Sequence, residues 1–422
     1  MHTKGHPRNS LFGMNWNPAG ATLVIMLTLL FLIFLFLFLT LTAQPAQGQT
    51  FSVLHNFTGG GDGARPDGLI LDRAGNLYGT TFQGGLINNL CPAGCGTVFK
   101  MSNRAGGWIL APLYQFQGTP SDGTVPQNPI FGPNGRIYGT TAGGSVFELA
   151  PPVTACLTSS CSWSHTQLYD LGDVVPFGDV AFDRTGDVYG ATFSGGEYNA
   201  GSVYELTPAG SGWMETVIYS FQWYVADQPE GGVIFDAAGI LYGTTPFAEG
   251  YGCAGIVYNL TPSEGGWTLS VFHCFNGSED GGMPVGDLIF DPAGNLYGTT
   301  YTGGPEGGGT VYMLTPSGEA TVLYGFDGSD GVPLYGVSMD AAGNVYGTTY
   351  CDGTCQDAPY GTVFMLRRSN GSWTYSLLHT FTGGSDGGQP EGAVAIDANG
   401  NVYGTAAQGG GYGAGVVFEI TP

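Results

Sequence analysis

A short phrase containing Tyr-Gly recurs seven times along this chain at nearly even spacing. The tyrosines of successive phrases are separated by 60, 51, 53, 55, 49 and 57 residues. A unit of that length is too small to bury its own core, so the units must pack against one another. The spacing therefore predicts a repeat architecture for residues 49–422, built from units of about 53 residues. The tyrosines are Tyr78, Tyr138, Tyr189, Tyr242, Tyr297, Tyr346 and Tyr403.

Each unit contains four short runs rich in Val, Ile, Tyr, Phe and Thr, bounded by Gly, Asp and Pro. At the end of the chain these runs are residues 377–381, 393–396, 402–405 and 416–420. Such runs are typical of an antiparallel meander, and no helical periodicity follows residue 50. Four strands in each of seven units predict an all-β fold, a seven-bladed β-propeller.

A tight turn precedes each Tyr-Gly step. Its first residue is Asp, whose carboxylate can accept hydrogen bonds from nearby amides, and its fourth is Gly, which supplies a positive φ. The second unit departs from the pattern with Gly132 in place of Asp, although Gly135 is kept. The six complete turns are Asp72/Gly75, Asp183/Gly186, Asp236/Gly239, Asp291/Gly294, Asp340/Gly343 and Asp397/Gly400.

The two ends of the repeat region are complementary. Residues 51–57 match the outermost strand of a unit, whereas the chain ends after residues 416–422, one strand short of a full blade. We therefore expect residues 51–57 to complete the blade built from about 393–420 and to close the ring by hydrogen bonding.

Residues 21–43 form an unbroken apolar run without charge, preceded by Lys4 and Arg8. The run is long enough to span a bilayer with the N-terminus inside. Small residues around Ala43 and Ala46 also fit the cleavage site of a signal peptide. Residues 1–48 are therefore interpreted as a signal peptide or an N-terminal membrane anchor. Both interpretations place residues 49–422 outside the cytoplasm, secreted or periplasmic.

The eight cysteines agree with an oxidising compartment, and all of them fall into local pairs. We predict four disulfides that staple loops. Zinc is the alternative, but the three short pairs lie in different units and cannot meet in one tetrahedral site. The predicted pairs are Cys91/Cys95, Cys156/Cys161, Cys253/Cys274 and Cys351/Cys355.

The chain is strongly acidic. It has 33 acidic and 10 basic residues, and without Lys4 and Arg8 the exported part carries 8 − 33 = −25. This charge argues against nucleic acid and against anionic membrane surfaces, so only the N-terminal segment is expected to contact a membrane. It suits a solvated, secreted monomer, and it leaves cations as a class of partner.

The long loops are expected on one face of the propeller, where the inner strands begin to line the central channel. An Asp-Gly step recurs in these loops, and its carboxylates are candidate ligands for Ca²⁺. The alternative is that Asp-Gly serves only as turn chemistry. The aspartates concerned are Asp62, Asp122, Asp227, Asp280, Asp330 and Asp386.

Polar residues that break the repeat at the start of the inner strand are the second group of candidates. We predict that they form a ligand-binding site at the channel mouth; the alternative is that they bond loop amides or face water. Paired carboxylates there would suit general acid–base chemistry. No nucleophile, oxyanion hole or metal set accompanies them, so no catalytic residue is assigned. The residues are Asp67, Asn128, Asp179, Glu230, Asp287 and Glu391.

The repeated phrase Gly-Asn-Leu-Tyr-Gly-Thr-Thr, followed by Gly-Gly and by Gly-Thr-Val-x-x-Leu, resembles the bacterial "GloVer" tandem-repeat family. Residues 294–300, 303–304 and 309–314 carry it most clearly, and it extends over nearly everything after residue 50. The resemblance implies an exported protein, with anchors that differ between members, and it brings no catalytic residues. This chain shows no C-terminal sorting tail, so we expect any anchor to be the N-terminal segment.

The function that these observations favour is an exported binding module. It would present long Gly- and Asp-rich loops on one face to a protein or a cell-surface glycan. Two alternatives stay open: a channel-mouth enzyme of polysaccharide hydrolase, lyase or lactonase type, and a structural envelope or adhesion protein. No cofactor is required by the sequence, and Ca²⁺ is the one ion under consideration.

Overall fold

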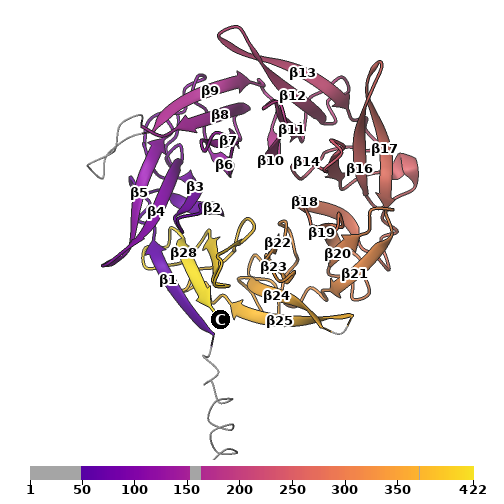
Figure 1. Cartoon of the computed structure of the whole chain (residues 1–422). Helices are drawn as coiled ribbons and strands as arrows, with labels where there is room; N and C mark the ends of the chain where they lie inside the picture. Colours follow the sequence, from indigo (N-terminus) through magenta and orange to yellow (C-terminus); the bar gives the residue numbers. More distant parts are fainter. Residues whose placement is uncertain (1–48, 153–162, 370) are drawn as a thin grey trace, which may run out of the picture. The chain divides into compact units, whose positions relative to one another are not determined.

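The computed structural model describes residues 49–152, 163–369 and 371–422. In this part of the chain, 28 strands form seven antiparallel sheets of four strands each. The sheets stand around a central opening (Figure 1). Apart from the 3-10 helix η1 (Glu249–Tyr251), the described ranges contain no helix. The fold is therefore a seven-bladed β-propeller, and the prediction from the repeat spacing is confirmed.

The first four blades follow one another along the chain. Blade one consists of β2 (Ala64–Leu71), β3 (Leu77–Gln83), β4 (Thr97–Arg104) and β5 (Gly107–Gln115). Blade two consists of β6 (Pro126–Phe131), β7 (Ile137–Thr141), β8 (Ser145–Ala150) and β9 (Ser164–Asp170). Blade three consists of β10 (Pro176–Phe182), β11 (Val188–Thr192), β12 (Ser202–Ala209) and β13 (Gly212–Ser220). Blade four consists of β14 (Ile234–Phe235), β15 (Leu241–Thr245), β16 (Ile256–Ser263) and β17 (Gly266–Cys274).

The remaining blades end with one that joins the two ends of the repeat region. Blade five consists of β18 (Gly282–Phe290), β19 (Leu296–Thr302), β20 (Thr310–Leu314) and β21 (Ala320–Gly325). Blade six consists of β22 (Ser338–Met339), β23 (Val345–Thr349), β24 (Thr362–Ser369) and β25 (Ser372–Thr380). Blade seven consists of β26 (Ala395–Ile396), β27 (Val402–Ala406), β28 (Val416–Thr421) and β1 (Thr50–Asn56).

The ring closes as predicted. Strand β1 pairs antiparallel with β28, from Thr50 opposite Thr421 to Asn56 opposite Val416. The N-terminal strand is thus the outermost strand of the last blade, beside β28 in Figure 1. Closure leaves no long unpaired edge between the first and the last blade.

The repeated phrase is one hydrogen-bonded unit. In blade five, Asp291 Oδ1 accepts the amides of Ala293 and Asn295 at 2.8 and 2.9 Å. Asp291 Oδ2 accepts Asn295 Nδ2 at 2.7 Å and the Tyr297 hydroxyl at 3.1 Å. Asp, Asn and Tyr therefore recur together because one carboxylate fixes the turn and the tyrosine beyond it. Equivalent bonds occur at Asp72, Asp340 and Asp397.

Blade two shows why its turn lacks the aspartate. A Cβ atom at Gly132 would lie 2.3 Å from Cε2 of Tyr138, which is buried. The Tyr138 hydroxyl instead donates to Glu148 Oε2 at 2.6 Å on the neighbouring strand. The tyrosine keeps a carboxylate partner, but the carboxylate comes from another strand.

Adjacent blades pack through a recurring contact between a glycine and a proline. A Cβ atom at Gly415, where φ is 96°, would lie 2.4 Å from Cδ of Pro66 in blade one. Only glycine fits such an approach, which accounts for part of the high glycine content. The same contact joins Gly96 to Pro126, Gly201 to Pro229, Gly255 to Pro284 and Gly361 to Pro390.

The hydrophobic core lies between the blades. One cluster, for example, joins Leu69, Leu77 and Phe99 of blade one to Tyr403 and Val417 of blade seven. Each sheet buries its apolar side chains against its neighbours, so no unit is expected to be stable alone.

Three of the four predicted disulfides are present: Cys91–Cys95, Cys253–Cys274 and Cys351–Cys355. These six cysteines are therefore bonded to one another and are not zinc ligands. Cys156 and Cys161 lie outside the described residues, as does the apolar run at 21–43. Among the residues that are described, no helix has the length and apolar character needed to cross a membrane.

Candidate functional site

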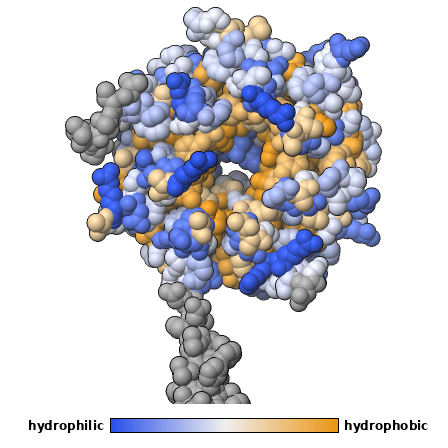
Figure 2. All heavy atoms as spheres, in the orientation of Figure 1, coloured by the Kyte–Doolittle hydropathy of each residue, from blue (hydrophilic) through white to orange (hydrophobic). Residues whose placement is uncertain are grey.

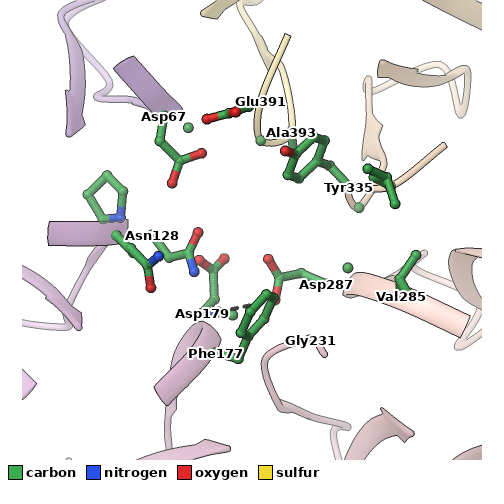
Figure 3. Close-up of a pocket in the computed structure, with 18 of the residues that line it drawn as sticks. Asp67, Asn128, Phe177, Asp179, Gly231, Val285, Asp287, Tyr335, Glu391 and Ala393 are labelled. Carbon is green, nitrogen blue, oxygen red and sulfur yellow. Dashed lines mark hydrogen bonds between the residues drawn. The ribbon is translucent and has the colours of Figure 1, made fainter. Parts of the chain in front are cut away.

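The central channel contains a pocket of about 340 Å³ lined by residues from all seven blades. The surface of the molecule is hollowed at this point (Figure 2). Figure 3 shows acidic and aromatic side chains approaching one another across the pocket from different blades.

All six residues predicted for the channel mouth line this one pocket. Asp67 and Glu391 are buried, whereas the other four are half-buried. The structure therefore brings together residues that are separated by up to 324 positions in the sequence, from Asp67 to Glu391. The residues are Asp67, Asn128, Asp179, Glu230, Asp287 and Glu391.

Irregularities in the inner strands place these side chains. The pairing of inner and second strands shifts register at Asp67/Leu69, Gln127/Ile130, Phe177/Ala181 and Val285/Ile289. The inner strands of blades four, six and seven have only two residues each. A bulge re-aims the side chains around it and is common beside functional sites. The inner strands are thus shorter or bent where the sequence predicted straight runs such as 393–396.

Asp67 lies in a strongly perturbed environment of the pocket. It is 5% exposed, and burial together with the charges of Glu391 and Asp287 raises its pKa to about 7. A carboxyl group with that pKa is partly protonated at neutral pH. Burial also raises the pKa of Glu230 and that of Glu391, although Arg65 opposes the shift at Glu391.

Asp287 joins three blades. Its Oδ1 accepts the amide of Gly232 in blade four at 2.6 Å and the amide of Asp179 in blade three at 3.1 Å. Burial and the charges of Asp287 and Asp67 raise the pKa of Asp179. The sequence left open the alternative that these acids bond loop amides. One oxygen of Asp287, Oδ1, does so.

One cation lies close to this group. Arg65 Nη2 is 3.4 Å from Glu391 Oε1, and the arginine side chain is 42% exposed. Glu391 Oε2 is buried and has no hydrogen-bond partner in the described part of the chain. The pocket therefore keeps unsatisfied acceptor capacity.

The sequence analysis missed the aromatic and apolar part of the lining. Phe177 and Tyr335 lie near Asp287 in Figure 3. Val285 and Leu334 also line the pocket. Phe177 follows the buried Pro176, as Asp67 follows Pro66 and Glu391 follows Pro390. The residue directly after this proline lines the pocket in each case, so the Pro-Phe step in the sequence could have identified Phe177.

The six aspartates predicted for the Asp-Gly motif do not line the pocket, and one of them, Asp227, is followed by Gln228 instead of glycine. Five of them accept a backbone amide within their own loop, as Asp62 does from Thr58 at 3.0 Å. Asp330 lies in the corresponding loop between β21 and β22. Across the described residues, no three His, Cys, Asp or Glu side chains are placed to hold a metal ion. Calcium binding at this motif stays a prediction.

Four of these aspartates contact a histidine of an outermost strand, and one of them is Asp122, whose Oδ1 lies 3.6 Å from Nδ1 of His165 in β9. The other three share one arrangement. The distances are 3.1 Å for His55–Asp62, 3.0 Å for His273–Asp280 and 3.1 Å for His379–Asp386. In these three pairs the histidine lies on the outermost strand of blade seven, four or six, and the aspartate lies in the loop that leads from that strand to the next blade. Their geometry supports a structural role for the Asp-Gly step.

The face formed by the long loops carries exposed aromatic side chains. Tyr224 is 81% exposed and Tyr412 is 69% exposed. All exposed aromatic residues of the described chain lie on loops or strand ends of this face, whereas the outer strands expose aliphatic residues such as Met214. The aromatic residues are Phe177, Tyr198, Trp223, Tyr224, Tyr251, Tyr301 and Tyr412.

Four of these aromatic residues belong to loops of blades three and four. A Cβ atom at Gly250 would lie 2.7 Å from Cα of Val225, so the loops that carry Tyr224 and Tyr251 contact each other. Beside them is a groove of about 410 Å³ lined in part by Tyr198, Tyr219 and Gln222. Aromatic and polar side chains thus meet at the rim of the face.

The fold and the site define a class: a closed seven-bladed β-propeller with an acidic channel pocket beneath an aromatic loop face. Matches to the Gloeobacter/Verrucomicrobia repeat cover residues 143–357 and 228–422, and together they span more than half of the 422 residues. The chain belongs to this repeat family, which confirms the resemblance found in the sequence.

Comparison with curated protein sequences finds no match. Among solved structures, the chain is similar to the WD40 β-propeller domain of Doa1, with 11% identity and a TM-score of 0.54 over 89% of this chain and 97% of that domain. A putative oxidoreductase (glucose dehydrogenase) from Thermus thermophilus has 18% identity and a TM-score of 0.43, over 71% and 97% of the two chains. A putative 6-phosphogluconolactonase from Bacteroides uniformis has 11% identity and a TM-score of 0.45, over 80% and 93%. At these identities the likeness concerns the fold alone.

Proposed function

We propose that this protein is an exported binding module that recognises a cell-surface glycan through its long-loop face. The observation that carries the proposal is the placement of every exposed aromatic side chain of the described residues on that face, with one of them, Phe177, lining the channel pocket. A sugar ring offers an apolar C–H face that stacks on an aromatic ring and hydroxyl groups that bond polar side chains. The aromatic residues are distributed over several loops of the face, an arrangement that suits several sugar units better than one flat apolar protein interface.

Export is supported by the three disulfides, because such bonds persist in oxidising compartments. The apolar N-terminal run would direct the chain across the membrane. A net negative charge would keep the exported domain soluble and monomeric.

The proposal is tested by titrating the full-length protein with a panel of soluble oligosaccharides and measuring heat of binding and the unfolding midpoint. A ligand of the native state raises the midpoint by mass action. The paired replacement Trp223→Ala and Tyr224→Ala is expected to weaken binding by about tenfold or more, since aromatic side chains that become buried on binding contribute much of the binding energy.

Met214→Ala is the matched control, because Met214 is 54% exposed on the outer strand β13. It should leave affinity unchanged. Equal loss in the control, or no binding by any oligosaccharide, would refute the glycan proposal. In the second case a protein ligand for the loop face becomes the better hypothesis.

A channel-mouth enzyme is the second candidate, and the pKa of Asp67 favours it. A carboxyl group with a pKa of about 7 can donate a proton to a leaving group at neutral pH. Release of reducing sugar or lactone opening that is lost in Asp67→Asn, with the fold intact, would support it. If no oligosaccharide that binds is turned over, the enzyme hypothesis is refuted and only the binding module is supported.

A further inference from the structure

The channel pocket has far more negative than positive charge. Five carboxylates line it, whereas no lysine, arginine or histidine belongs to its described lining. The nearest guanidinium, Arg65, pairs with Glu391 alone and is partly exposed. Buried charges are normally paired, so this pocket is short of a cationic partner. The carboxylates are Asp67, Asp179, Glu230, Asp287 and Glu391.

A second observation concerns an unsatisfied atom rather than charge. Glu391 is 7% exposed, and its Oε2 atom has no hydrogen-bond partner among the described residues. Figure 3 shows Glu391 beside Asp67 at the pocket. Buried acceptors in native proteins are normally bonded, so a water molecule, an ion or a ligand is expected to supply the donor; Nε of Arg65, the residue paired with Glu391, is likewise buried and without a partner among the described residues.

The shape of the lining distinguishes an organic cation from a metal ion. No three carboxylates or other metal-ligating side chains of the described chain are placed around one ion position. The pocket of about 340 Å³ instead spaces its carboxylates around a larger volume. Phe177, which is 40% exposed, and Tyr335 add aromatic faces to it. Carboxylates combined with aromatic faces are typical of sites for ammonium groups.

We propose that the channel pocket binds the protonated primary amine of an amino sugar, so that the glycan recognised by the loop face carries free amino groups. This inference rests on the proposed function and deepens it by naming the ligand class. An ammonium group has three donors, so it can bond Glu391 Oε2 and still donate to the sugar's own hydroxyls or to water. The sugar that bears it would extend from the channel toward the aromatic residues of the loop face.

The test compares two oligosaccharides with the same backbone. The full-length protein is titrated by calorimetry with a glucosamine tetramer and with its fully N-acetylated counterpart, in which each amine has become a neutral amide. The free amine is expected to bind about tenfold or more tightly, and the preference should disappear in Asp67→Asn and in Asp179→Asn. Binding of the amine should also release protons to the buffer, since it favours ionised carboxylates.

Asp187→Asn is the control variant. It removes one negative charge from the opposite face and installs the residue that most other blades carry in that turn. It should leave both affinities unchanged.

Each outcome bears on the proposal. Equal binding of the two tetramers overturns the amine site while the glycan-binding function stands. Binding of neither tetramer overturns the amine site, and the glycan-binding function is then decided by the wider oligosaccharide panel. Binding of Ca²⁺ that is lost in Asp67→Asn and Asp179→Asn, with no preference between the sugars, overturns the amine in favour of a metal. If Asp187→Asn also lost the preference for the free-amine tetramer, the preference would result from the net charge of the protein and the amine site would be overturned.

Discussion

Aspartates occur in two regions of this propeller in opposite physical states. In the turns of the short-turn face, burial acts to raise the pKa of Asp291, but hydrogen bonds from Asn295, Tyr297 and Ala293 outweigh it and the pKa lies below its usual value. In the channel, burial and neighbouring carboxylates raise the pKa of Asp67 to about 7. The pKa of the same side chain is thus lowered by hydrogen bonds in one region and raised by burial and neighbouring carboxylates in the other.

The difference separates structure from function. The turn aspartates recur in almost every blade because each one holds its own blade together. The channel acids occur in some blades only, and their arrangement opposes stability in the free protein. A group that costs stability and does not repeat is a better candidate for binding than one that recurs with all its bonds made.

The largest expected effect is stabilisation by Asp67→Asn. A raised folded-state pKa means that the native state binds more protons than the unfolded chain between about pH 4 and pH 7, so stability falls as pH rises through this window. At about pH 8 the neutral amide should therefore raise the free energy of unfolding by as much as about 4 kcal/mol. Urea unfolding at about pH 8 and about pH 4 measures this, with little difference expected at the lower pH. A variant less stable than the parent at both pH values would show that Asp67 is structural.

The next effect comes from forcing the turn aspartate into the blade that lacks it. Gly132→Asp should destabilise the protein by about 2 kcal/mol, because the new Cβ would meet the buried ring of Tyr138 at 2.3 Å. Gly106→Asp is the control in a hairpin of the same face, since a Cβ atom there has nothing within 4 Å. Thermal unfolding compares the two. Equal midpoints would mean that blade two tolerates the common turn and that Glu148 is not its substitute.

A smaller loss is expected for Asp291→Asn in a turn. The amide can no longer accept bonds from both Asn295 Nδ2 and the Tyr297 hydroxyl, which should lower the free energy of unfolding by about 1–2 kcal/mol given partial exposure to solvent. The carboxylate contributes its stability above the unfolded pKa and loses it as pH falls through the lowered folded pKa. The difference between variant and parent in urea should therefore shrink in acid. A gain in stability at neutral pH, as at Asp67, would remove the contrast between the two regions.

The smallest effect concerns blade three, where Asp187 replaces the usual asparagine. Asp183 and Asp187 both accept the Thr185 hydroxyl, so two carboxylates share one donor. Asp187→Asn should supply an amide donor to Asp183 and raise stability by about 0.5 kcal/mol. Precise unfolding curves on the two proteins at low ionic strength measure it. A loss of stability would indicate that this pair of acids holds a cation.

Much of the fold was predictable because its causes are local. The Tyr-Gly repeat, the Asp-x-x-Gly turn and the complementary ends predicted seven blades and closure by residues 51–57, and β1 pairs with β28 as expected. The channel acids were predictable for a related reason: in a repeat, a position that departs from its equivalents stands out in the sequence. The inner strands of three blades were overestimated, since β26, for example, pairs with β27 only at Ala395 and Ile396.

By itself, the sequence determined the repeat, the blade count and the residue types at the start of each inner strand. Only the tertiary structure decided that Asp287 would bond the amides of Asp179 and Gly232 in other blades, and that Phe177 and Tyr335 would line the acidic pocket. The physical reason is distance along the chain. Turns form from neighbouring residues, whereas burial and the charge of one carboxylate on another depend on which blades the closed ring brings together.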